Sequence, residues 1–127
     1  MTDFALVVPI LNPGSIWKKW IAGFQAQSIK PIRLLIVDSG SSDGTLEICQ
    51  ASEFEIISID KRDFNHGGTR QLALQHVQKN VEYIIYMTQD AVLTDAHALE
   101  KILEPFKDPK VAAVCGRQLP HPGAGPI

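Results

Sequence analysis

A polar turn that directly follows an apolar run is the strongest chemical signal in this sequence. Residues Leu34–Thr45 read LLIVDSGSSDGT, so a carboxylate ends the run and small hydroxyl and glycine residues follow it. Asp38 can accept a hydrogen bond from a nucleobase N–H or a ribose hydroxyl. Ser41, Ser42 and Asp43 are more simply explained as helix caps, because the segment after them has a helical pattern whose first N–H groups need acceptors.

A second polar segment, Asn65–Arg70, reads NHGGTR and leads into a helical pattern. Glycines before a helix expose backbone N–H groups, which favour anions. Arg70 adds planar donors that suit a phosphate or a pyrimidine carbonyl. The signal is weak alone, because there is no Walker lysine and no GxGxxG pattern, and His66 is more simply a turn residue.

The third segment is TQDA, Thr88–Ala91, which follows another apolar run. A single acidic residue such as Asp90 can reach a divalent cation or a sugar hydroxyl. Magnesium often takes one or two protein carboxylates and draws its other oxygens from substrate phosphates. Asp90 is therefore a candidate ligand for a metal or a sugar.

The elements that must position these residues alternate between strand and helix. Apolar runs predict strands, and Ser15 is a candidate cap for a helix whose apolar residues Trp17, Trp20, Ile21 and Phe24 repeat at helical spacing. The expected strands are Phe4–Ile10, Ile32–Val37, Glu55–Ile59, Tyr83–Thr88 and Val111–Val114; the later helices are Asp43–Ser52, Thr69–Gln78 and Asp95–Phe106, and Asp60–Gly68 is a loop.

This order predicts an α/β fold, a mainly parallel sheet with helices on both faces. The fourth run is apolar throughout, as in a strand buried on both faces. Ligands of such folds bind outside the carboxyl ends of the strands, near a topological switch point. Asn12, Asp38 and Asp90 each follow a predicted strand, so they are expected at that edge, and Asp38, Arg70 and Asp90 in one crevice.

Composition narrows the possible functions. The chain has 127 residues, 45% hydrophobic and 20% charged, which is typical of one globular domain. With 12 basic and 14 acidic residues it lacks the broad basic surface of a nucleic-acid-binding protein. Cys49 and Cys115 fit no disulfide framework or metal motif, so we expect two reduced thiols. The sequence shows no signal peptide and no membrane-spanning segment, so we expect a soluble cytosolic protein.

The C-terminal stretch, residues 117–127, is rich in proline and glycine and contains no further apolar element. It is more typical of a loop leading to another part than of a domain end. We therefore expect residues 1–116 to form one structural unit, and residues 117–127 to lead to a further part outside this sequence.

Four motifs together are more specific than any one of them: VVPILN, LIVDSGSSDGT, NHGGTRQLA and TQDA, in this order. The combination resembles the nucleotide-binding half of family 2 glycosyltransferases, which have the GT-A fold, over nearly the whole chain. FNHGGTR with TQDA and the closing GRQLPHP is most similar to the bacterial rhamnosyltransferases of that family.

The resemblance implies a nucleoside diphosphate sugar, dTDP-L-rhamnose, bound across the strand ends. It implies that Asp38 contacts the nucleobase and that Arg70 lies on the same nucleotide side. It also implies that Asp90 lies near the ribose and the diphosphate. The residues it places around the nucleotide sugar are Pro9, Asn12, Asp38, Gly40, Arg70, Gln89 and Asp90.

The resemblance also implies inverting transfer to a bacterial polysaccharide or lipid-linked glycan at the cytoplasmic face of the membrane, with the catalytic base beyond Ile127. Thr88 and Ala91 stand where many members have acids, so a divalent cation (Mg²⁺ or Mn²⁺) at Asp90 is in question. Two other classes stay open: a sugar-1-phosphate nucleotidyltransferase, which normally has a glycine-rich triphosphate loop after its first strand, and a non-catalytic binding or assembly module.

Overall fold

The computed structural model describes residues 3–60, 62, 68, 75, 81–93 and 95–114. Four strands form one parallel sheet, and three helices and a 3-10 turn accompany them within these ranges. In chain order the elements are β1 (Phe4–Ile10), α1 (Ile16–Gln25), β2 (Arg33–Asp38), α2 (Thr45–Ala51), β3 (Glu55–Ser58), β4 (Tyr83–Tyr86), α4 (Ala98–Leu103) and η2 (Glu104–Lys107).

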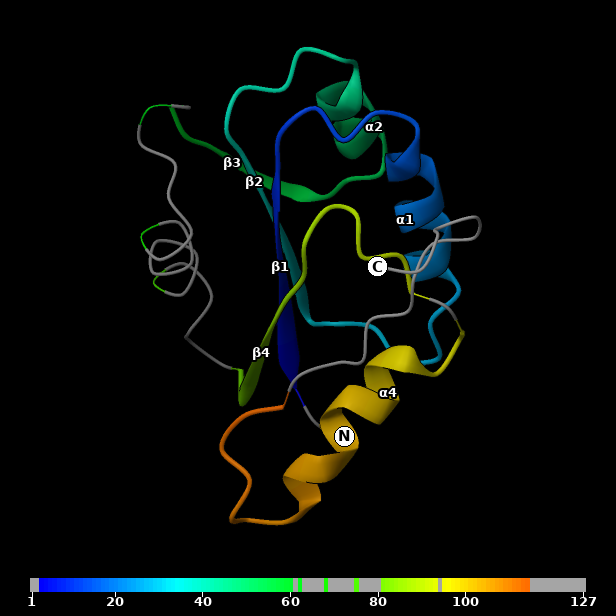
Figure 1. Ribbon diagram of the computed structural model, residues 1–127, viewed down its shortest axis with the longest axis vertical. Helices are drawn as coiled ribbons and strands as arrows, with labels where there is room; N and C mark the ends of the chain where they lie inside the picture. Colours follow the sequence, from blue (N-terminus) through cyan, green and yellow to red (C-terminus); the bar gives the residue numbers. More distant parts are fainter. Residues whose placement is uncertain are drawn as a thin grey trace, which may run out of the picture.

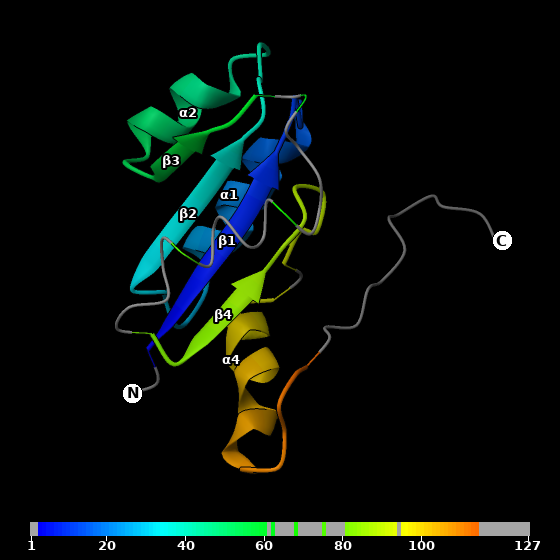
Figure 2. The same ribbon diagram turned by 90° about the vertical axis from the view of Figure 1, so that its left-hand side faces the viewer.

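The sheet order is β3-β2-β1-β4, and every pairing is parallel. Figure 2 shows the four arrows side by side, all pointing the same way. The chain moves from β1 outward to β2 and β3, then returns to the other side of β1 to form β4. The strand order therefore reverses between β1 and β4, which makes that boundary the topological switch point.

The two faces of β1 carry alternate residues, and both are buried. Phe4, Leu6, Val8 and Ile10 join the larger apolar cluster, which includes side chains of α1, α2 and α4. The remaining positions, such as Ala5 and Val7, join a second cluster. Figure 1 shows α1, α2 and α4 on one side of the sheet. Burial on both faces is characteristic of a central parallel strand, and the parallel sheet with helices confirms the predicted α/β class. The described helices lie on one face, so helices on the second face stay a prediction.

Helix α1 is held by aromatic side chains at the spacing that its sequence predicts. Trp17 and Trp20 stack with ring centroids 4.7 Å apart, and Phe24 continues the stack at 5.5 Å from Trp20. All three side chains are buried against the sheet. Ser15 occupies the N-cap position, but its side chain makes no capping hydrogen bond, so the cap predicted there is wrong.

Several predicted boundaries differ from the observed ones. Strand β2 begins at Arg33, and Ile32 is 50% exposed before it. Strand β4 ends at Tyr86, whose 37% exposure corrects the expectation of a strand buried on both faces. The fourth helix gives way to the 3-10 turn η2, because Pro105 cannot continue an α-helical hydrogen-bond ladder.

The predicted fifth strand, Val111–Val114, is absent, since these residues have no regular secondary structure and Ala112 and Ala113 are exposed. A short apolar run forms a strand only where a neighbouring strand pairs with it. The predicted loop Asp60–Gly68 lies mostly, and the helix Thr69–Gln78 almost wholly, outside the described residues. None of the helices in the described ranges has the length and apolarity that a membrane crossing needs.

Cys49 is buried and unpaired, as the sequence predicts, and burial raises the pKa of its thiol. Cys115 lies outside the described residues.

The buried amide of Gln27 joins the end of α1 to the start of α4. Its Nε2 donates to the carbonyl oxygens of Gly23 and Asp95, at 3.1 and 2.7 Å, and its Oε1 accepts from the N–H of Leu99 at 3.1 Å. Gln27 is only 5% exposed, so water cannot replace these partners. The amide thus fixes the segment that follows the predicted TQDA site.

Replacing Gln27 by Glu keeps the shape but points a carboxylate at two carbonyl oxygens. We expect the free energy of unfolding at neutral pH to fall by about 3 kcal/mol, measured by urea unfolding. Burial raises the pKa of the new carboxyl in the folded state above its unfolded value, so the folded state binds more protons. The deficit relative to wild type should therefore shrink as pH falls toward about 5.

The matched control is Gln25→Glu, which adds the same charge at an exposed position of the same helix. It should stay within about 0.5 kcal/mol of the wild type. Equal losses in the two variants would show that the Gln27 amide does not join the helices energetically.

Candidate functional site at the carboxyl edge of the sheet

Three loops meet where the parallel strands end. They are the β1 loop (residues 11–14), the β2 loop (residues 39–44) and the β4 loop (residues 87–93). The register pairs Ile10 with Asp38, so β1 and β2 end level. Strand β4 ends earlier, with Tyr86 opposite Val7. Its loop therefore runs past the last residues of β1, and the N–H of Met87 donates to the carbonyl oxygen of Val7 at 2.9 Å.

The backbone N–H groups of the β1 loop all donate to side chains of the other two loops. The N–H of Leu11 donates to Oε1 of Gln89 at 2.8 Å, and that of Asn12 donates to Oγ of Ser41 at 3.0 Å. The N–H of Gly14 donates to Oδ2 of Asp43 at 2.8 Å. Pro13 has no N–H. The β1 loop is therefore braced from both sides.

Asn12 completes this brace in the opposite direction. Its Oδ1 accepts from the N–H of Ser42 at 2.7 Å, so the β1 and β2 loops exchange two hydrogen bonds through Asn12. The backbone of Asn12 has a φ of 45°, a left-handed conformation that asparagine tolerates better than most residues. Its amide oxygen thus holds the loop rather than facing a ligand.

Asp38 lies at the predicted edge but turns inward. Its carboxylate accepts from the N–H of Gly40 at 3.1 Å and from the N–H of Ser41 at 3.1 and 3.2 Å. The residue is 2% exposed. Gly40 has a φ of 116°, which suits glycine and lets the backbone fold around the carboxylate. In this structure Asp38 shapes the β2 loop from within.

Asp43 accepts from the first N–H of α2, as the sequence favours, although Gly44 occupies the N-cap position. One carboxylate oxygen accepts from the backbone N–H and the hydroxyl of Thr45, and the other accepts from Gly14. The hydroxyl of Thr45, followed by the backbone donors, holds the pKa of this carboxyl below its usual value. Ser41 and Ser42 do not cap the helix, because they bond to Asn12 instead.

Gln89 and Asp90 lie on the other side of the β1 loop. Gln89 is partly exposed and anchored to Leu11, and Asp90 is exposed. Within the described residues, the carboxylate of Asp90 has neither a hydrogen-bond donor nor an ion-pair partner, whereas those of Asp38, Asp43 and Asp60 are all engaged. Asp90 is therefore the carboxylate at this edge that remains available to a ligand.

The sequence-predicted residues are thus brought together in part. Pro9 ends β1 with Ile10, and Asn12, Gly40, Gln89 and Asp90 stand in the three loops around it. Arg70 and His66 lie outside the described residues, so the convergence of Asp38, Arg70 and Asp90 stays a prediction. No cluster of three or more His, Cys, Asp or Glu residues that could hold a metal ion occurs in the described part of the chain.

The bracing roles of Ser41 and Asp43 toward the β1 loop escape sequence reasoning. Both residues stand out in the sequence, but as helix caps. The partner N–H groups lie 29 residues earlier, on Asn12 and Gly14. The one usable signal is Pro-Gly after Asn12, which indicates a tight loop whose N–H groups need acceptors elsewhere.

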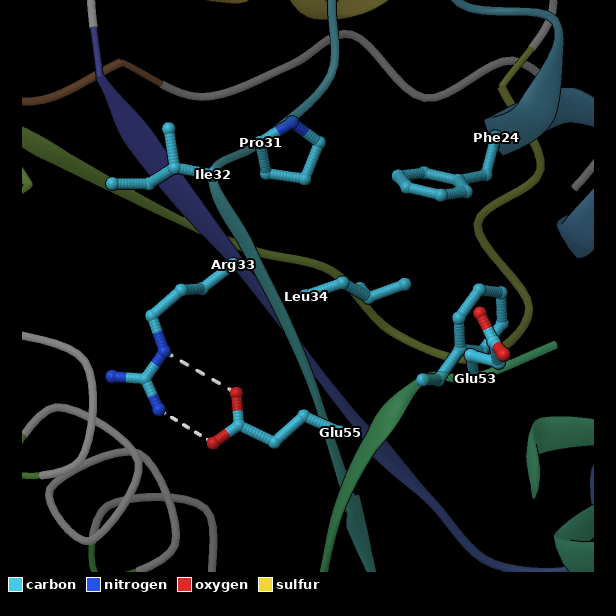
Figure 3. Close-up of a pocket in the computed structure, with 8 residues that line it drawn as sticks. Phe24, Pro31, Ile32, Arg33, Leu34, Glu53 and Glu55 are labelled. Carbon is cyan, nitrogen blue, oxygen red and sulfur yellow. Dashed lines mark hydrogen bonds and ion pairs between the residues drawn. The ribbon is translucent and has the colours of Figure 1, made fainter.

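A pocket of about 270 Å³ lies at the opposite end of the sheet. Figure 3 shows it between the end of α1, at Phe24, and the amino ends of β2 and β3. Arg33 and Glu55 form an ion pair at its border (Figure 3), so their charges largely offset each other. Leu34 lines this pocket, but the candidate site residues Asp38, Gln89 and Asp90 do not.

Comparison with known proteins agrees with this architecture. The sequence profile described as Glycosyl transferase family 2 matches residues 5–125. The chain is 44% identical over its whole length to the O-antigen chain rhamnosyltransferase WbaN of Salmonella anatum, and 43% identical over 96% of its length to the O-antigen chain rhamnosyltransferase RfbN of Salmonella typhimurium. It spans 40% and 39% of the lengths of these relatives.

Solved structures share the fold at lower identity. TarS of S. aureus, in complex with UDP-GlcNAc, superposes with a TM-score of 0.65 at 19% identity over 94% of this chain and 37% of that one. Glucosyl-3-phosphoglycerate synthase of Mycobacterium tuberculosis, in complex with Mn²⁺, UDP and glucosyl-3-phosphoglycerate, gives 0.65 at 18% identity over 83% of this chain and 39% of that one.

Substitutions of Asn12 test whether the hydrogen bonds between the β1 and β2 loops stabilise the fold. Asn12→Gly loses the acceptor for Ser42 but keeps the backbone freedom, so we expect unfolding to become easier by about 1 kcal/mol. Asn12→Ala also forces a Cβ-bearing residue without a compensating amide into the left-handed region, for a total of about 2 kcal/mol. Denaturant unfolding measures both.

Asn12→Asp is the control, because it keeps an acceptor at the same position and should stay close to the wild type. If Asn12→Ala were as stable as the wild type, neither the hydrogen bond nor the backbone conformation at residue 12 would constrain the loop.

Proposed function

The chain belongs to glycosyl transferase family 2, and we propose from this premise that it binds the nucleoside diphosphate sugar of a sugar-transfer reaction. One observation carries the proposal: the inward-folded turn at Asp38 and the exposed Asp90 flank the braced β1 loop, beside the boundary where the strand order reverses. Parallel α/β sheets bind nucleotides at such a boundary.

The donor we propose is dTDP-L-rhamnose. The support is the similarity to two rhamnosyltransferases at 43–44% identity and the motif combination FNHGGTR with TQDA. The structural relatives crystallised with UDP or UDP-GlcNAc are below 25% identity and support a shared fold alone.

A divalent cation at Asp90 fits the described residues in part. One exposed carboxylate can serve as a Mg²⁺ or Mn²⁺ ligand when the diphosphate supplies further oxygens. Ala91 and Thr88 add no carboxylate beside it. If no cation binds, Arg70 is the residue we propose to offset the charge of the leaving diphosphate.

The transfer we propose is a single displacement with inversion at the anomeric carbon. It requires a carboxylate that takes the proton of the acceptor hydroxyl, and we place that base in residues that follow Ile127. Residues 1–116 would then be the donor-binding half, and residues 117–127 would lead to the acceptor-binding part. We propose a polysaccharide or lipid-linked glycan acceptor on the cytoplasmic side of the membrane.

A sugar-1-phosphate nucleotidyltransferase fits these residues less well. Such an enzyme cradles a triphosphate with backbone N–H groups after its first strand. Here the β1 loop is four residues long, and each N–H that it has is used by a side chain of a neighbouring loop.

Nucleotide titrations test the donor assignment. We expect dTDP to bind at least about tenfold more tightly than UDP or GDP, a difference of about 1.4 kcal/mol, by isothermal titration calorimetry. If a cation bridges Asp90 and the diphosphate, Mg²⁺ or Mn²⁺ should strengthen binding to the wild type, and Asp90→Asn should abolish that gain. Asp3→Asn, an exposed aspartate at the amino end of β1, is the control for loss of one charge.

Asp38 is a poorer probe, because its replacement would disturb the β2 loop in any case. Equal binding of dTDP, UDP and GDP would remove the assignment of the donor. Absence of binding by all three would remove the proposed function itself.

A transfer assay tests whether residues 1–127 bind the donor but lack the catalytic base. We expect the 127-residue chain to bind dTDP-rhamnose but to release no dTDP in the presence of acceptor, whereas a chain extended to the length of the relatives turns over. Coupled detection of released dTDP measures both. Comparable rates for the two chains would show that the base lies within residues 1–127.

A further inference from the structure

The side chain of Gln89 spans the point at which the strand order reverses. Strand β4 ends opposite Val7, and its loop continues along β1 until Gln89 reaches the N–H of Leu11. The resulting hydrogen bond, at 2.8 Å, joins the β4 loop to the β1 loop directly beside the switch point. A ligand bound at this edge of the sheet would meet this amide.

The hydrogen bond from Leu11 determines the orientation of the Gln89 amide. A backbone N–H needs an acceptor, so Oε1 must face Leu11 and the NH₂ group must occupy the other side. Within the part of the chain that the structure describes, Nε2 has no hydrogen-bond partner, and the side chain is partly exposed. The NH₂ group of Gln89 therefore keeps its two N–H donors for a ligand, while its Oε1 is engaged by Leu11.

Gln89 and its neighbour Asp90 offer different interactions to a ligand at this edge of the sheet. A carboxylate accepts hydrogen bonds from sugar hydroxyls or binds a cation, while locked N–H donors need a partner that only accepts. A diphosphate presents only acceptors at neutral pH. The hydrogen bond from Leu11 to Oε1 also polarises the amide and strengthens its N–H groups as donors.

We propose that Gln89 is a nucleotide-binding residue whose Nε2 donates to the diphosphate of the bound nucleotide, with the β1 loop holding the amide in that orientation. This rests on the proposed function, because it requires a nucleoside diphosphate at this edge. It predicts that position 89 distinguishes an amide from the carboxylate of the same shape.

The decisive variant is Gln89→Glu in the full chain. Glutamate keeps an oxygen for the N–H of Leu11, so the loops should stay joined and the unfolding midpoint should match that of the wild type. The second oxygen, however, would set a negative charge against the diphosphate. We expect dTDP affinity to fall by about tenfold or more, since like charges in a binding site are costly.

Thymidine, dTMP and dTDP locate the contact. The titrations are done in EDTA, so that the added carboxylate cannot recruit a cation. The affinity lost by Gln89→Glu should increase with each phosphate and shrink at high salt, because the repulsion is electrostatic. Gln89→Met adds no charge but removes the donors together with the acceptor for the N–H of Leu11. It should weaken dTDP binding by a smaller factor, and should weaken dTDP binding more than thymidine binding. That comparison is made within one variant, so it stays valid if the glutamate variant folds poorly.

The outcomes are separable. If wild-type chain binds none of the three ligands, the proposed function fails. If wild type binds dTDP and Gln89→Glu binds it within about twofold, the role of Gln89 fails alone. A loss of equal size for thymidine and dTDP would place the amide at the nucleoside and overturn the assignment to the diphosphate.

Discussion

The candidate site depends on the acceptors that hydrogen-bond to the backbone N–H groups of the short β1 loop. At the end of a parallel strand these groups leave the sheet ladder and need acceptors, because unpaired polar groups are costly where water is restricted. Here Gln89, Ser41 and Asp43 supply the acceptors, one from the β4 loop and two from the β2 loop. These hydrogen bonds hold the β1 loop in place and join it to the β2 and β4 loops.

The stagger of the strands makes this possible. Strands β1 and β2 end level, which brings Asn12 beside Ser41 and Ser42. Strand β4 stops opposite Val7, so two further residues, Met87 and Thr88, come before Gln89 meets Leu11. Beyond the end of the β4 loop, Gln27 ties the chain at Asp95 to Gly23 of α1. The chain is therefore anchored at Gln89, just before Asp90, and again at Asp95.

The sequence is sufficient to predict the parallel α/β architecture and to predict that Asn12, Asp38 and Asp90 follow the carboxyl ends of strands. Strand β1 is predicted without error, because a continuous apolar run ends in Asn-Pro-Gly. Val111–Val114 has a similar composition but forms no strand, since pairing is decided by a neighbour and not by the run itself.

The orientation of site residues is harder to predict than their position. That Asp38 follows β2 is readable from the sequence, but its inward turn depends on the φ of Gly40 and on two local N–H groups. The bonds of Asn12 to Ser41 and Ser42 cross about 30 residues and exist only once β1 and β2 are paired. Such contacts follow from register, which a single sequence does not encode locally.

The distribution of charge at this edge favours one direction of ligand approach. The carboxylate of Asp38 accepts hydrogen bonds within its own loop, that of Asp43 accepts them from Thr45 and Gly14, and Asp60 pairs with Arg62. Asp90 is exposed in the β4 loop, has no such partner within the described residues, and lies next to Gln89. A ligand with both hydroxyls and an anionic group can satisfy these two residues together, whereas a simple anion would meet the uncompensated repulsion of Asp90. A nucleotide sugar has both kinds of group, and its diphosphate would lie toward Gln89 while a hydroxyl or a bridging cation would lie toward Asp90.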